Sequence, residues 1–99
     1  MRLSTLAGST IRDTVRSVLG PAARVRLFGS RTNDSARGGD IDLLVELDTA
    51  IEQPALVAAR IGALLQLALG DQRIDVVISA PNLPDQAIHK IARTTGIAL

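Results

Sequence analysis

Two carboxylates stand two residues apart at the start of an apolar run. They are Asp40 and Asp42 in the segment GGDIDLLVEL, and a polar loop separates them from a Gly29-Ser30 pair. Side chains at this spacing project from the same face of a strand, with Cα atoms about 6.5–7 Å apart. Such a pair can converge on Mg²⁺, which prefers one or two carboxylates together with phosphate oxygens and water. The pattern predicts chemistry on a phosphate group with one or two magnesium ions.

A third acid, Asp75, interrupts the apolar segment RIDVVIS. If its strand neighbours the strand of Asp40 and Asp42, the three carboxylates form one cluster. Carboxylates brought together out of water are costly unless a metal ion or arginines neutralise them. Asp75 therefore has two readings, a site residue or a structural partner of Arg24 or Arg26 across strands.

The loop before the acidic pair carries groups that suit a triphosphate. Glycine at position 29 lets a phosphate approach the backbone, and Ser30 supplies a hydroxyl and an amide donor. Arg31 and Arg37 can bind phosphate oxygens, although either can equally be an ordinary surface arginine. The sequence contains no Gly-Lys-Ser/Thr segment, which excludes a P-loop.

The remaining candidate groups favour structural roles. Glu46 shares the strand face of Asp42 but lies further along it, so we expect a solvated or salt-bridged side chain. We expect Asp48 to lie in a turn. His89 has no second metal ligand at a useful spacing, so we expect it at the surface or packed at a helix end.

The elements that must position these residues follow from apolar spacing and from Gly and Pro. We expect a first helix from a cap at Ser9 or Thr10 to Gly20, helices over 54–69 and 84–94, and strands over 24–28, 40–47 and 73–78. In the last helix, the predicted inward residues are Ile88, Ile91 and Ala92. This order predicts one domain over residues 1–99, of α/β or α+β class, with a short mixed sheet and helices packed on one face.

The helix over 54–69 is apolar nearly all round, with Arg60 and Gln66 its strongly polar residues. The predicted core stripe is Val57, Ile61, Leu64, Leu65 and Ala68. A second strip of Leu56, Ala63 and Leu67 can face the C-terminal helix or a partner protein, and the sequence favours neither.

Composition excludes several classes of function. Phe28 is the only aromatic residue and the net charge is +1, which argues against nucleic-acid binding by stacking or by a basic surface. Cysteine is absent, which fits a reducing compartment. The N-terminal segment turns polar too soon for a signal peptide, and no apolar run is long enough to span a bilayer. We therefore expect a cytoplasmic protein.

Gly29-Ser30 followed by Asp40-Ile41-Asp42 at the head of an apolar strand resembles the signature of the DNA polymerase β-type nucleotidyltransferase superfamily. Nine residues separate the two pieces, and Asp75 takes the place of a third family carboxylate. The size resembles that of the minimal nucleotidyltransferases (MNT), which are commonly encoded beside small helical HEPN-domain proteins as toxin–antitoxin pairs. Family members act as antitoxins, and some transfer AMP from ATP to a tyrosine hydroxyl of the toxin.

This resemblance implies the nucleotidyltransferase fold and a Mg²⁺-dependent transfer of a nucleoside monophosphate, AMP from ATP, to a hydroxyl of a HEPN-type toxin. Asp40, Asp42 and Asp75 would be the catalytic and metal-binding residues. Gly29 and Ser30, joined by Arg31 and Arg37, would hold the triphosphate. The alternatives are a catalytically inactive antitoxin that neutralises its partner by contact, and a transferase acting on a small molecule. The sequence leaves the base preference, the acceptor and the oligomeric state open.

Overall fold

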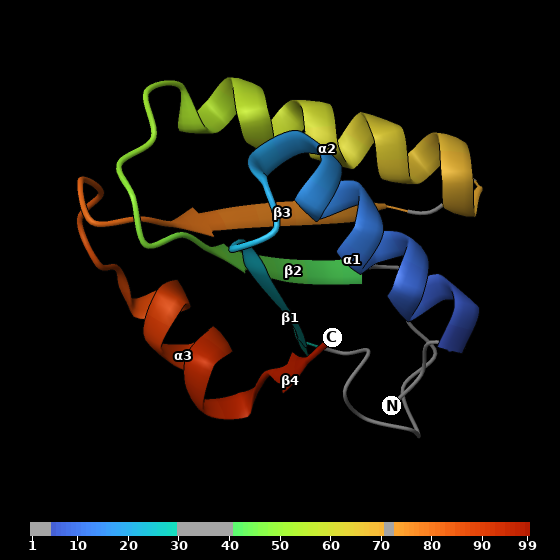
Figure 1. Cartoon of the computed structure of the whole chain (residues 1–99). Helices are drawn as coiled ribbons and strands as arrows, with labels where there is room; N and C mark the ends of the chain where they lie inside the picture. Colours follow the sequence, from blue (N-terminus) through green and yellow to red (C-terminus); the bar gives the residue numbers. More distant parts are fainter. Residues whose placement is uncertain (1–4, 30–40, 71–72) are drawn as a thin grey trace.

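A computed structural model of the chain describes residues 5–29, 41–70 and 73–99. These residues form three helices and four strands (Figure 1). In chain order they are α1 (Thr5–Leu19), β1 (Arg24–Phe28), β2 (Ile41–Glu46), α2 (Pro54–Leu69), β3 (Ile74–Ser79), α3 (Ala87–Thr95) and β4 (Ile97–Ala98). The expected α/β class with a short mixed sheet is confirmed.

The strands form one sheet in the order β3-β2-β1-β4. β1 is antiparallel to both β2 and β4, while β2 and β3 are parallel. The parallel pair needs a crossover connection, which α2 provides. Pro54 begins this helix, and Gly70, with φ +93°, follows its end.

The main core lies between the sheet and the α1–α2 layer. Alternation along the strands sends Val25, Leu27, Leu43 and Val45 into this core, where they pack with Ile11 of α1 and Ile61 of α2. Their side chains are almost completely buried. With a single aromatic residue in the chain, branched aliphatic side chains fill this layer.

The third helix corrects one expectation, because it does not share the face covered by α1 and α2. Phe28, Leu44 and Ala92 form a second buried cluster, which Val77 joins. Leu44 alternates with the core residues Leu43 and Val45, so this cluster lies on the opposite face of the sheet. Figure 1 shows α3 across the sheet from α2.

Several predicted boundaries shift in the structure. α1 begins at Thr5, before the predicted cap, and α3 begins at Ala87 rather than near residue 84. The short strand β4 was not predicted. It pairs with β1, and the Leu99 N–H donates to the Val25 carbonyl at 3.0 Å.

The apolar surface of α2 is largely open among the described residues. Leu56 is 63% and Leu67 85% exposed, and Ala63 is also exposed. This strip does not face the C-terminal helix, because α3 lies beyond the sheet. In the predicted core stripe, Ile61 and Leu65 are buried, whereas Leu64 and Ala68 are exposed. No helix within the described residues is long and apolar enough to cross a membrane.

Candidate active site

Two of the predicted carboxylates lie side by side on the sheet. β2 and β3 run parallel, and their register places Asp42 directly beside Asp75. Neighbouring strands lie about 4.8 Å apart, and residues in register project from the same face. The Asp42 and Asp75 side chains both lie on the sheet face that α3 covers, because the residues before and after each of them point into the main core. The predicted meeting of these two acids is confirmed by this register.

Gly29 lies directly against Asp42. It follows the last residue of β1, and Phe28 of that strand is the register partner of Asp42. The backbone of Gly29 has φ +77°, a conformation that L side chains rarely adopt. A Cβ added at this position would collide with the Asp42 carboxylate. The positive φ therefore favours glycine, and any larger residue would also have to push the Asp42 carboxylate aside.

Asp75 has an arginine partner, but not one of those considered from the sequence. Arg73 Nε lies 3.3 Å from Asp75 Oδ2, and the two side chains are 70% and 47% exposed. Arg24 instead pairs with Asp48, and Arg26 with Glu46. The Arg73 ion pair is open to water, so it stabilises the fold little and leaves the carboxylate accessible.

The other predicted site residues lie outside the described part of the chain. They are Asp40, Ser30, Arg31 and Arg37. Within residues 5–29, 41–70 and 73–99, no group of three metal-ligating side chains is present. Asp42 and Asp75 are thus the part of the predicted acidic cluster that the structure describes.

These acids open into a groove of about 650 Å³ between the sheet and α3. Its walls are formed by Phe28, Gly29, Asp42, Asp75, Val77, Ile88, Ile91 and Thr95. Of the three residues of α3 predicted to point inward, Ala92 is buried as predicted, but the prediction is wrong for Ile88 and Ile91, since His89 takes the other buried position. Ile88 and Ile91 instead line the groove.

On the side of α3 that does not line the groove, a network of ion pairs joins this helix to the sheet. Glu46 accepts from Arg26 Nε at 2.8 Å and lies 3.5 Å from Arg93 Nε. Its side chain is only 12% exposed, so the salt-bridged alternative predicted for Glu46 is confirmed. Arg93 also donates to Asp85 and to the Ser79 hydroxyl. The hydrogen bond from Arg93 lowers the pKa of Asp85 below its ordinary value.

His89 anchors the start of α3, which confirms the expectation of helix-end packing and rejects a surface position. It is buried, and its Nδ1 accepts from the Gln86 N–H at 2.9 Å. Its Nε2 lies 3.0 Å from the Ile78 carbonyl, and the first bond makes Nε2 the donor of the second. Both ring nitrogens are thus engaged within the fold.

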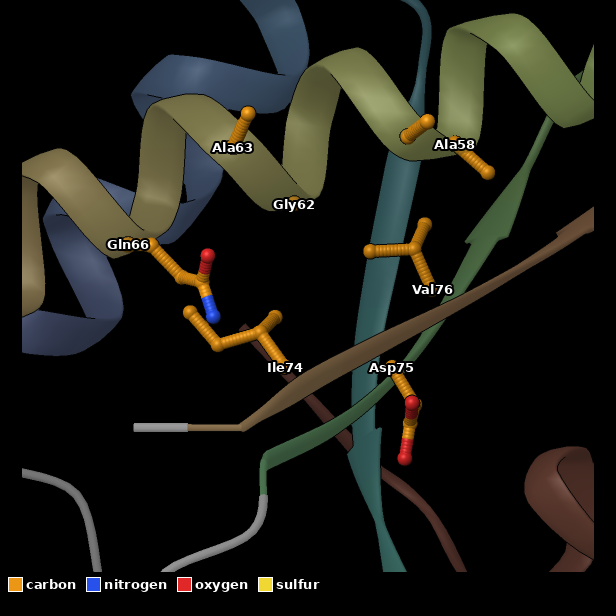
Figure 2. Close-up of a pocket in the computed structure, with 8 residues that line it drawn as sticks. Ala58, Gly62, Ala63, Gln66, Ile74, Asp75 and Val76 are labelled. Atoms are coloured by element: carbon orange, nitrogen blue, oxygen red, sulfur yellow. The ribbon is translucent and has the colours of Figure 1, made fainter. Parts of the chain in front are cut away.

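A second hollow lies on the opposite side of β3, between that strand and α2 (Figure 2). Small residues line its helical wall, namely Ala58, Ala59, Gly62 and Ala63. In Figure 2, Ile74 and Val76 extend toward α2, whereas the Asp75 carboxylate extends away from it. The two faces of β3 thus differ in chemistry, and the acids belong to the α3 side.

Comparisons with known proteins bear on this geometry. One solved structure, a toxin–antitoxin complex of MntA and HpeT in a mutant form, matches with a TM-score of 0.68 and 22% identity. The match covers 92% of this chain and 68% of the other. A second is the complex of tri-AMPylated Shewanella oneidensis HEPN toxin with MNT antitoxin, with a TM-score of 0.67 and 21% identity. It covers 97% of this chain and 71% of the other.

The chain has the fold of the MNT antitoxins. The MNT fold expected from the sequence resemblance is confirmed by these two structures. No family model matches the sequence, and no curated protein does. The likeness to these two structures therefore concerns the fold alone.

Proposed function

We propose that this protein is a Mg²⁺-dependent nucleotidyltransferase that moves AMP from ATP to a hydroxyl of a HEPN-type toxin and thereby acts as its antitoxin. The observation that carries the proposal is the in-register pair Asp42 and Asp75 with Gly29 against the first carboxylate. The MNT fold supports it, and in one solved complex of that fold the HEPN toxin is tri-AMPylated.

The carboxylates fit a hard divalent cation. Asp42 and Asp75 offer oxygen ligands at the wall of an open groove, which leaves space for water and phosphate oxygens. Asp75 already lies beside one positive group, the Arg73 guanidinium. Asp42, Asp75 and Asp40 would hold Mg²⁺, which when bound neutralises phosphate charge and polarises the α-phosphate.

The protein's own residues would bind and orient the reactants. Gly29 would let a phosphate approach its backbone N–H, with Ser30, Arg31 and Arg37 as further phosphate ligands. Asp75 would align the acceptor hydroxyl and take up its proton. The hydroxyl oxygen then bonds to the α-phosphorus, the bond from that phosphorus to the bridging oxygen breaks, and pyrophosphate leaves. Placement and charge neutralisation supply most of the catalysis in such transfers.

The direct experiment uses ATP labelled on the α-phosphate, Mg²⁺ and a HEPN-type partner protein, to be sought in the reading frame beside this gene. We expect label on the partner, release of pyrophosphate and loss of both in EDTA. A parallel reaction with ATP labelled on the γ-phosphate should leave the partner unlabelled. An intact complex of the two proteins that gains no α-label would reject the transferase proposal.

A second candidate function is neutralisation by contact alone. The observation that favours it is the exposed strip of α2, in which Leu56 and Leu67 are mostly open to solvent. Under this alternative, Leu56→Ser with Leu67→Ser abolishes protection against the toxin, and Asp42→Asn preserves it. The transferase proposal expects Asp42→Asn to abolish protection while the two proteins still associate.

A further inference from the structure

A small hollow at the opposite end of β1 from the active site is lined by four arginines. Its volume is about 130 Å³, a fifth of that of the active-site groove. Arg12 and Arg16 line it from α1, and Arg24 and Arg26 line it from the start of β1. From Arg24 the strand runs about 16 Å before the chain reaches Gly29. The hollow is therefore separate from the candidate active site.

The ion pairs of the two β1 arginines do not use up their positive charge and their donors. Arg24 donates to both carboxylate oxygens of Asp48, and Arg26 Nε donates to Glu46. Glu46 also lines the hollow, but its second oxygen lies 3.5 Å from Arg93, so two guanidinium groups share this one carboxylate. The other N–H donors of Arg26 have no partner within the described residues.

The two α1 arginines are engaged even less. Within the part of the chain that the structure describes, the Arg16 side chain makes no hydrogen bond or ion pair. Arg12 lies 3.4 Å from the Ser9 hydroxyl and 3.9 Å from the exposed Asp13 carboxylate. A cation is favoured in the last turn of a helix, which accounts for Arg16 alone. Two arginines four residues apart on one helix repel each other, and an anion in the hollow would relieve that repulsion.

From this surplus of donors we propose that the hollow binds a phosphate group with two negative charges, either inorganic phosphate or the phosphate of a monoester. Arginine suits phosphate because its planar guanidinium donates to two oxygens at once. Donors from two elements, α1 and β1, suit a tetrahedral anion, whereas one guanidinium already satisfies a planar carboxylate, as Arg24 does for Asp48.

The size of the hollow limits what else can enter with the phosphate. Pockets that enclose a whole drug-sized ligand begin at about 300 Å³. A hollow of about 130 Å³ therefore takes the phosphate and leaves the rest of a larger ligand in solvent. The phosphodiester of a nucleic acid is a poorer fit, because it carries one charge and the net charge of the chain is only +1. This site does not depend on AMP transfer.

The binding test uses the whole chain in EDTA, so that no divalent cation can hold phosphate at the aspartates. The probes, at constant ionic strength, are inorganic phosphate, methyl phosphate, dimethyl phosphate and acetate. Backbone amide NMR reports on the hollow through Ala23 and Ala98, and on the active site through Gly29. We expect inorganic phosphate, at a pH where it is mainly the dianion, to shift the Ala23 and Ala98 amides until they saturate.

The other probes identify the source of the phosphate and the outcomes that would overturn the proposal. Methyl phosphate that binds as tightly as inorganic phosphate assigns the site to a monoester, whereas binding of inorganic phosphate alone assigns it to the free ion. Equal binding of dimethyl phosphate or acetate, shifts confined to Gly29, or no saturable shift with any probe would reject the phosphate site.

Arg16→Gln tests the hollow itself, because this side chain has no bond within the described residues to lose. We expect the dissociation constant for phosphate to rise about tenfold, since one charge-assisted hydrogen bond is removed. The matched control is Arg60→Gln on α2, which removes an exposed arginine that also lacks an ion pair among the described residues. It should change the constant by no more than about twofold, because salt screens distant charges. Equal losses in both variants would show an effect of net charge alone and reject the site.

Discussion

Asp42 and Asp75 are register partners on parallel neighbouring strands, on the sheet face that α3 covers. Separated by 33 positions in the sequence, they become adjacent because α2 returns the chain to the same edge of β2. Neither side chain enters the main core. The fold thus holds two like charges next to each other at the wall of a groove, an arrangement that favours a bound cation.

Gly29 provides a test of the close approach to Asp42. In Gly29→Ala the added Cβ meets the Asp42 carboxylate, so we expect AMP transfer to fall at least tenfold. The positive φ also costs about 1–2 kcal/mol of stability for alanine. Urea unfolding and labelled-ATP transfer measure the two effects.

Gly20 and Gly70 supply the controls for that substitution. Both have positive φ, +97° and +93°, but a Cβ at either would meet no atom within 4 Å. Gly20→Ala should therefore lose about 1–2 kcal/mol of stability, and Gly70→Ala, with φ +93° and ψ −166° in a region that glycine alone adopts readily, about 1–3 kcal/mol, while both keep full activity. Equal activity in all three variants would show that the contact between Gly29 and Asp42 has no functional role.

Glu46 holds α3 in place and thereby positions the far wall of the groove. Its side chain is 12% exposed between Arg26 and Arg93, so Glu46→Gln leaves both guanidinium groups without their shared carboxylate. We expect a loss of about 1–2 kcal/mol in the free energy of unfolding. Asp48→Asn, which breaks the exposed pair with Arg24, is the control and should destabilise less. An equal loss in both variants would contradict a special role for the buried network.

Asp85 gives a pH dependence with a defined sign. Its hydrogen bond with Arg93 lowers the pKa of this carboxyl below 3.8, its ordinary value. A lowered folded-state pKa stabilises the protein above the unfolded pKa, and the contribution disappears as the pH falls through the folded value. In Arg93→Gln, carboxyl NMR titration should find the Asp85 pKa raised toward 3.8. The pKa of Asp48, which Arg24 lowers, should not move.

The sequence predicted the first three strands and the helix over 54–69 well because their signals are local. Strand 24–28 and helix 54–69 agree with the structure, since alternation, Pro54 and Gly70 mark them directly. The meeting of Asp42 with Asp75 followed from resemblance to a known signature, because spacing alone does not say which strands are neighbours.

Local signals of this kind did not predict where α3 packs. Ile88, Ile91 and Ala92 have the spacing of a buried helix face, yet only Ala92 of these three is buried, together with His89. A histidine with both ring nitrogens bonded can occupy the interior, and this tertiary arrangement turns the isoleucines toward the groove. The same arrangement rules out the alternative that the α2 strip faces the C-terminal helix, and contact with a partner protein stays a prediction.

The central claim is that the Asp42 and Asp75 carboxylates carry out AMP transfer. The most direct measurement compares Asp42→Asn and Asp75→Asn with Asp13→Asn, an exposed control on α1, by transfer of α-labelled AMP to the HEPN-type partner. We predict that the two site variants keep the wild-type fold and still bind the partner, but label it at least a hundredfold more slowly, while Asp13→Asn is unchanged. Labelling by Asp42→Asn or Asp75→Asn at the wild-type rate would contradict the account.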